Sequence, residues 1–186
     1  MAKVEMSAAM AAAQRTSGST EPTVHEIFTQ INNAKDKPKK IAILKKHDTQ
    51  AMRQLLKAAF DPKIEFALPD GTPPFIRNEA PAGTEHTSLF YASKKLWRFV
   101  KGADPDTKQM TREKMFLGLL ESLHEKDAEV LIGIKDKKIN NMYKGLTAAV
   151  VKETFNWTND FVKSDGKSIL KAVSYTHLTL PTMFEV

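Results

Sequence analysis

Apolar side chains recur every three or four residues along this chain, and the runs tend to start behind residues that can cap a helix. The clearest run follows the i, i+3, i+4, i+7 spacing of one helix face and consists of Val24, Ile27, Phe28 and Ile31. It starts at Thr23-Val24-His25-Glu26, which has the form of a capping box. Because a half-buried strand needs a period of two instead, the sequence predicts an all-α protein.

The same pattern predicts a single compact domain of about seven short helices. Their approximate ranges are 24–33, 38–46, 48–60, 87–102, a segment that ends near 124, 126–134 and 147–155. Asp48 is the expected cap of the third helix, and Thr147 is the expected cap of the last. Gly102 is expected to end the fourth helix in the left-handed conformation. In the second helix Ile41 and Leu44 face inward, whereas Ile43 falls on the charged side.

Residues 61–84 interrupt the helical pattern. They contain five of the nine prolines, and Ile64, Phe66 and Leu68 alternate along them, so we predict a long proline-rich extended crossing. Loops of this length in a compact domain are either functional or held in place by their own apolar side chains. Phe66, Phe75 and Ile76 are the residues expected to hold this one.

The chain divides into a predicted helical domain at 23–172 and two flanking segments. Residues 1–22 lack a regular apolar face, and we expect a disordered or frayed tail there. Residues 173–182 carry no charge apart from His177 and resemble one translated frame of a transposase sequencing adapter. We therefore expect residues 173–186 to be a non-native tail, with the native chain interrupted near Ala172. The alternative is an exposed strand, since this segment is rich in β-branched residues.

Composition excludes several classes of protein. There is no cysteine, which rules out disulfide frameworks, thiolate metal sites and cysteine nucleophiles. No apolar run reaches the roughly 18 residues of a membrane helix, and the first 20 residues lack the apolar core of a signal peptide. We therefore expect a soluble, intracellular protein. The net charge is +6, and the positive charge belongs to the predicted domain, which favours contact with phosphate or acidic surfaces.

Two known functional motifs, one phosphate-binding and one catalytic, are present only in part. Gly166-Lys167-Ser168 is the end of a P-loop pattern, but Phe161 stands where its first glycine should be. His25-Glu26 begins like a zinc-protease motif, but Thr29 replaces the second histidine. We expect neither a metal nor a cofactor.

Lysines form two clusters that are the candidate interaction surface. The first consists of Lys35, Lys37, Lys39, Lys40, Lys45 and Lys46, and the second of Lys135, Lys137, Lys138 and Lys144. If both lie on one side of the fold, they can track a phosphate backbone without reading its sequence. Lysine far outnumbers arginine and few aromatic residues are expected among these lysines, so neither base readout nor base stacking is indicated. The plainer interpretation is a solvated face.

Several short sequence segments between residues 23 and 161 resemble those of a known family. They are Thr23-Val24-His25-Glu26-Ile27-Phe28, Phe60-Asp61-Pro62, Leu68-Pro69-Asp70-Gly71-Thr72-Pro73-Pro74, Glu79-Ala80-Pro81-Ala82-Gly83, Phe99-Val100-Lys101-Gly102, Leu120-Glu121-Ser122-Leu123-His124, Asp127-Ala128-Glu129, Lys135-Asp136-Lys137-Lys138 and Tyr143-Lys144-Gly145-Leu146-Thr147. Their order resembles a family of uncharacterised small proteins of marine T-even-like tailed phages. The resemblance implies a phage gene expressed in a bacterial host, but it implies no activity and no site. It also places the expected start of the native protein nearer Thr23.

These observations together favour an accessory protein in the cytoplasm of the infected host. The expected function is non-enzymatic binding, either of nucleic acid without sequence preference or of a host or phage protein. One alternative is a minor virion structural or assembly protein, for which a salt-insensitive, concentration-dependent oligomer would be evidence. The other is a small hydrolase that uses His124 with Glu121 or Glu125, which requires these groups to meet in a cleft.

Overall fold

The computed structural model describes residues 22–78 and 86–157, and its regular elements within these ranges are helices. They are α2 (Val24–Asn33), α3 (Lys37–Lys46), α4 (Gln50–Phe60), α5 (Leu89–Ala92), the 3₁₀ helix η1 (Ser93–Phe99), α6 (Gln109–Ser122), α7 (Glu125–Lys135), α8 (Ile139–Met142) and α9 (Ala148–Phe155). The predicted all-α fold is confirmed. The predicted tail at 173–186, nearly all of the one at 1–22, Phe161 and the Gly166-Lys167-Ser168 motif lie outside the described residues.

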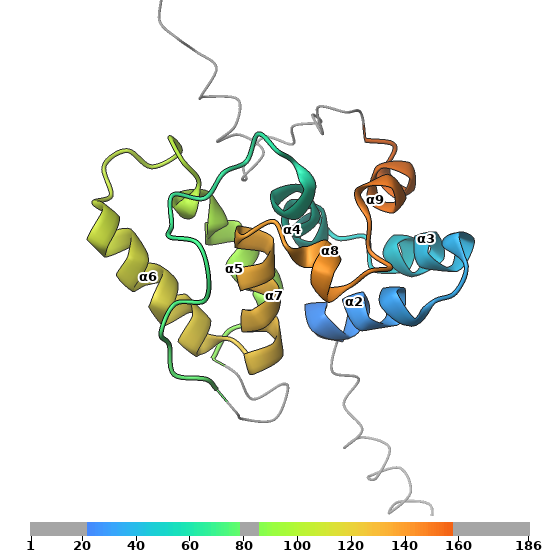
Figure 1. The fold of residues 1–186 in the computed structure, drawn as a ribbon, viewed down its shortest axis with the longest axis horizontal. Coiled ribbons are helices and arrows are strands. Elements are labelled where there is room, and N and C mark those ends of the chain that lie inside the picture. The colour runs from blue at the N-terminus through green and yellow to red at the C-terminus, as the bar shows by residue number, and fades with distance from the viewer. Residues whose placement is uncertain (1–21, 79–85, 158–186) are drawn as a thin grey trace, which may run out of the picture.

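Helix α7 lies in the middle of the molecule, between α6 on one side and α2 and α8 on the other (Figure 1). It packs against α2, α4, α5, α6 and α8, and it is buried on nearly every face. In the helix predicted at 126–134, the spacing of Val130, Leu131 and Ile134 indicates a single inner face. The central position of α7 also buries Ala128 and Ile132, so a single cluster of buried apolar side chains runs from α2 to α9.

Side-chain caps start several of the helices where the sequence places them. The capping box is present, since Thr23 Oγ1 accepts from the Glu26 N–H and the Glu26 carboxylate accepts from the Thr23 N–H. The Thr147 hydroxyl caps α9 as predicted. The third helix differs, because Thr49 caps α4 while the expected cap, Asp48, pairs with Arg53.

The fourth predicted helix is not one continuous α-helix. After the single turn of α5 the chain tightens into η1, which ends at Phe99. Beyond that point Val100 forms an isolated antiparallel bridge with Phe66 of the crossing. The Ala67 N–H donates to the Phe99 carbonyl and the Lys101 N–H to the Glu65 carbonyl, at 2.7 and 2.8 Å. These bonds hold the chain in an extended conformation at Val100, so the helix does not continue beyond Phe99. Gly102 takes the expected left-handed conformation at φ 76°.

The crossing is held by polar contacts as much as by its own apolar side chains. Phe66 is buried and Phe75 is partly buried against the core, as expected, but Ile76 is 79% exposed. The Ile76 N–H instead donates to the Glu121 carboxylate, and the Gly71 N–H donates to Asp136. The prediction that Ile76 holds the crossing through burial is therefore wrong, because a backbone contact holds the segment at that point.

No helix in residues 22–78 and 86–157 is both long enough and apolar enough to cross a membrane. The short α8 was not predicted, because its four residues span scarcely one helical turn and show no clear periodicity.

Candidate functional site

The lysines of α3 differ in their contacts, although all of them except Lys40 are exposed. Lys37 forms an ion pair with Glu153 of α9, and Lys39 pairs with Asp36 at 3.0 Å. Lys40 is half-buried at the junction with Gly145. The remaining lysines of the first cluster, Lys35, Lys45 and Lys46, are exposed. Lys45 and Lys46 occupy the last turn of α3, where the partial negative charge of the helix terminus also favours them.

The second lysine cluster does not form one surface. Lys135 is buried, and its ammonium donates to the Pro69 carbonyl at 2.6 Å and pairs with Asp136. The Lys137 ammonium donates to the carbonyls of Ala58 and Asp61 at the end of α4. Lys138 and Lys144 are exposed. The structure therefore removes Lys135 and Lys137 from the candidate surface, because their ammonium groups bond to backbone carbonyls inside the fold.

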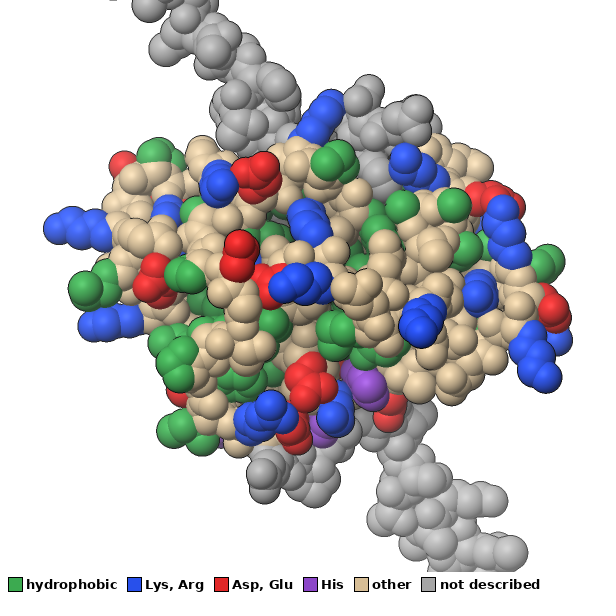
Figure 2. Space-filling view, viewed as in Figure 1, with side chains coloured by type: hydrophobic (Ala, Val, Ile, Leu, Met, Phe, Trp, Pro, Cys, Tyr) green, Lys and Arg blue, Asp and Glu red, His purple; other side chains and the backbone are tan. Residues whose placement is uncertain are grey.

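Acidic and basic side chains alternate on the face that Figure 2 shows. Lysine and arginine side chains gather toward the edge of the molecule over α3, at the right of the view, but aspartate and glutamate side chains lie among them. Opposite charges this close weaken the field that a polyanion would meet. This face alone is therefore a poor phosphate-binding surface.

A more uniform basic surface forms where the end of α3 meets α5 and η1. One pocket of about 590 Å³ is lined in part by Lys46, His47 and Lys94. A second pocket, of about 450 Å³, is lined in part by Lys95 and Arg98. Neither described lining includes an aspartate or a glutamate. We define the basic face as Lys46, Lys94, Lys95 and Arg98 of these linings together with Lys45, the exposed neighbour of Lys46 in the last turn of α3.

Sequence reasoning missed the part of this surface that belongs to η1, three of its five residues. Lys94, Lys95 and Arg98 were not singled out from the sequence, although Lys94 and Lys95 follow Tyr91 at i+3 and i+4, a spacing that places side chains together. That spacing was an available signal. The proximity of these residues to Lys46 could not be seen in the sequence, because it depends on the packing of α5 and η1 against α4.

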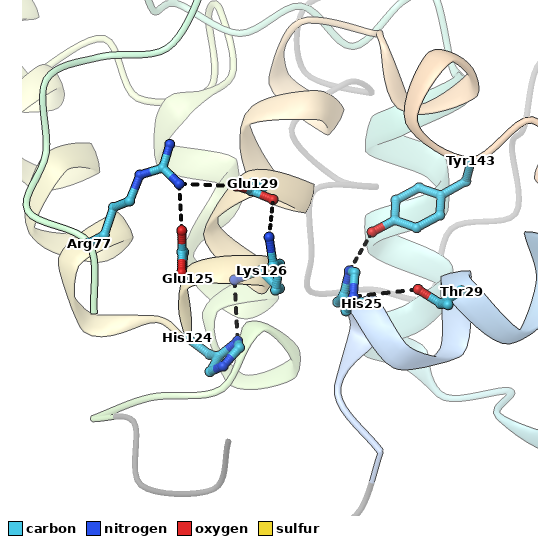
Figure 3. A network of polar contacts seen from close by, with 8 residues as sticks. All are labelled: His25, Thr29, Arg77, His124, Glu125, Lys126, Glu129 and Tyr143. Atoms are coloured by element: carbon cyan, nitrogen blue, oxygen red, sulfur yellow. Dashed lines mark hydrogen bonds and ion pairs between the residues drawn. The ribbon is translucent and has the colours of Figure 1, made fainter. Parts of the chain in front are cut away.

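His124 and the two glutamates of the predicted hydrolase site each make a structural contact. His124 is the N-cap of α7, and its Nδ1 accepts from the Lys126 N–H at 3.2 Å. Glu125 pairs with Arg77 of the crossing, as Figure 3 shows. Glu121 accepts from the Ile76 N–H. The two glutamate contacts fasten the crossing to α6 and α7.

His25 belongs to a separate part of the network in Figure 3, between α2 and the end of α8. Burial lowers the pKa of His25, and the neighbouring charge of Lys126 lowers it further. Burial raises the pKa of the Tyr143 phenol to about 12, with added contributions from the Asp127 and Glu129 carboxylates. Both groups are therefore neutral near pH 7, and a hydrogen bond of 2.7 Å joins the Tyr143 hydroxyl to His25 Nδ1. The Asp127 carboxylate accepts from the His25 N–H, which satisfies one of the free amides at the start of α2.

Within the two described ranges, no three histidine, aspartate or glutamate side chains converge in a way that could hold a metal ion. The polar groups with shifted pKa values at α2, α7 and α8 are used to join helices. The basic face is therefore the strongest candidate for a functional site in the part of the chain that the structure describes.

Comparison with curated proteins and with solved structures gave no significant match. Residues 27–141 match a family model whose description is "Family of unknown function (DUF6433)". This range includes α3, α5, η1 and all five residues of the basic face. Because the match covers more than half of the 186 residues, the chain belongs to this family of unknown function.

Proposed function

We propose that this chain is a non-enzymatic nucleic-acid-binding protein that acts in a host cell infected by a tailed phage. The proposal depends on one observation, the two neighbouring pockets whose linings contain lysine, arginine and histidine but no described acidic residue. Phosphate is the ligand that such a surface favours, because each lysine or arginine that neutralises a phosphate releases a condensed counterion. The resemblance to phage proteins supports the biological setting.

The side chains that could serve as catalytic acids or bases already make contacts within the fold, and this supports a non-enzymatic role. His124 caps α7, Glu125 pairs with Arg77, and His25 is bonded on both ring nitrogens, to Tyr143 and more weakly to Thr29. A general base needs a free lone pair within reach of a substrate. In these residues the group that would act as a base already holds part of the fold together.

The test is the salt dependence of DNA binding. With about five phosphate contacts, log K should fall against log salt concentration with a slope of roughly −4.5 on duplex DNA and −3.5 on single strands. Fluorescence anisotropy of a labelled oligonucleotide with the full-length protein measures both slopes. Retention of DNA that does not change with salt, or no retention at low salt, would contradict the proposal.

A pair of variants locates the site. Lys46→Gln with Lys94→Gln removes two charges from the basic face and should weaken binding and reduce the magnitude of the slope by about two. Lys108→Gln with Lys144→Gln removes the same charge from exposed positions that belong to neither described pocket lining. This control should keep the slope. Equal losses in the two double variants would show that net charge, and not the basic face, governs binding.

A further inference from the structure

Tyr91 stands between the two pockets of the basic face and contributes to the lining of both. Its side chain comes from the single turn of α5, and the residue is 54% exposed. The Ser88 hydroxyl accepts from the Tyr91 N–H at 3.3 Å, which fixes the backbone that carries the ring. A large aromatic ring that is held in place and left more than half exposed needs an explanation other than core packing.

Cations surround this ring. The ammonium groups of Lys94 and Lys95 lie 5.5 and 5.4 Å from the centre of the Tyr91 ring. Asp48, which adjoins His47 in the sequence, is neutralised by two hydrogen bonds of 2.6 Å from Arg53. A ligand at Tyr91 therefore meets an aromatic surface with positive charge on both sides and no described carboxylate in either pocket lining.

A base stacked on the ring can replace the two lysines that contact it now. Stacking of a nucleic-acid base on an aromatic side chain is at least comparable in strength to two cation–π contacts at an exposed site. A lysine displaced by the base can bind the adjacent phosphate instead. Ring and lysines can thus act on the same nucleotide.

We propose that Tyr91 stacks on an unpaired base, and that the pockets on either side of it receive the flanking nucleotides of a single strand. The inference rests on the proposed nucleic-acid function and narrows its ligand from nucleic acid in general to single-stranded nucleic acid. In a duplex each base face is covered by its neighbours in the stack, so an exposed ring favours unpaired bases. Pocket volumes of about 450 and 590 Å³ lie in the range of sites that hold small organic ligands.

The experiment compares a labelled oligothymidylate with a duplex of the same length, using the full-length protein and its variants at the same series of salt concentrations. Tyr91→Ala should weaken binding of the single strand by between about fivefold and 150-fold, the change that corresponds to loss of one stacked base, and should change duplex binding little. Tyr91→Phe keeps the ring and should keep most of the single-strand affinity. Tyr91→Leu keeps an apolar side chain without an aromatic face and should behave like Tyr91→Ala.

Met110→Ala is the matched control, because Met110 is another large exposed apolar residue, at 70%, and belongs to α6. It should bind both oligonucleotides as the unchanged protein does. If binding is salt-dependent but Tyr91→Ala and Tyr91→Leu keep their single-strand affinity, the stacking proposal fails and the basic face stands. If neither oligonucleotide binds in a salt-dependent way, the stacking proposal and the proposed nucleic-acid-binding function both fail.

Discussion

Lys137 joins the end of α7, where its backbone lies, to the end of α4, where its ammonium donates hydrogen bonds. Its backbone takes the left-handed conformation at φ 58°, where glycine is usual, and completes a Schellman motif at the end of α7 through the bonds Lys137 N–H to Ile134 and Lys138 N–H to Gly133. Its ammonium then satisfies carbonyls at the end of α4. The residue as a whole is exposed, but its charged end lies inside the fold. Burial lowers the pKa of that ammonium to about 8, although the charges of Asp61 and Glu65 raise it.

This pKa predicts a pH dependence of stability. Because the folded-state pKa of about 8 lies below the ordinary value of 10.5, the folded protein releases this proton first as the pH rises. The free energy of unfolding of the unchanged protein should therefore rise between these two pH values relative to a Lys137→Met variant. Urea denaturation of both proteins across the interval measures the difference. A difference that stays flat or falls would show that the ammonium is not desolvated.

Close approach of backbones joins α2 to the turn that precedes α9. A Cβ atom on Gly145 would stand 2.9 Å from the Asn32 Cα atom and 2.9 Å from the Ile31 carbonyl oxygen. The Gly145 N–H also donates to the Asn32 side chain at 3.1 Å. Only glycine allows this contact, which brings the last turn of α2 against the chain that leads into α9.

Two glycine substitutions should have opposite effects. Gly145→Ala should destabilise the protein by about 1–3 kcal/mol, since backbone atoms must move to admit the methyl group. Gly118→Ala should stabilise it by about 0.5–1 kcal/mol, because Gly118 lies within α6 with no atom within 4 Å of the added methyl. Chemical denaturation of both variants checks the pair. A neutral Gly145→Ala would mean that α2 and this turn separate easily.

The crossing depends on α7 for its position. Lys135 and Asp136 form an ion pair at the end of α7, with side chains only 2% and 6% exposed, and they also bond to Pro69 and Gly71 of the crossing. The described part of the crossing, residues 61–78, contains no helix and is thus held by the terminus of α7.

Removal of Asp136 should therefore be costly. Asp136→Ala leaves the Lys135 ammonium buried without its carboxylate and should destabilise the fold by about 3–5 kcal/mol. Asp70→Ala removes an exposed carboxylate from the same segment and should change stability by no more than about 0.5 kcal/mol. Thermal or urea unfolding distinguishes the two. Similar losses of stability in both variants would show that any change in the crossing destabilises the fold, and that loss of the ion pair is not the cause.

At the scale of the whole molecule, the buried apolar residues form one cluster from α2 to α9. The two tryptophans pack against this cluster from different elements, Trp97 from η1 and Trp157 after α9, where it stacks on Phe155 at 4.9 Å. A continuous core of this kind favours a single cooperative unfolding transition.

Single-tryptophan variants can test this cooperativity. In Trp97→Phe the remaining fluorescence reports on the α9 end, and in Trp157→Phe it reports on η1. Within each variant the fluorescence midpoint in urea should coincide with the midpoint of the helical circular dichroism signal. An earlier fluorescence transition in Trp97→Phe alone would show that α9 unfolds separately from the rest.

The amino-acid sequence by itself was sufficient for the helical class and for most helix boundaries, because caps such as Thr23 and Thr147 and the stripe from Val24 to Ile31 act within a few residues. It did not reveal the central place of α7 or the break of the fourth helix at Val100, since these follow from contacts with distant segments. The same holds for the candidate site. Lysines look alike in a sequence, and only the tertiary structure turns Lys135 and Lys137 inward and brings Lys46 beside Lys94 and Tyr91, because packing decides which charged groups stay in water.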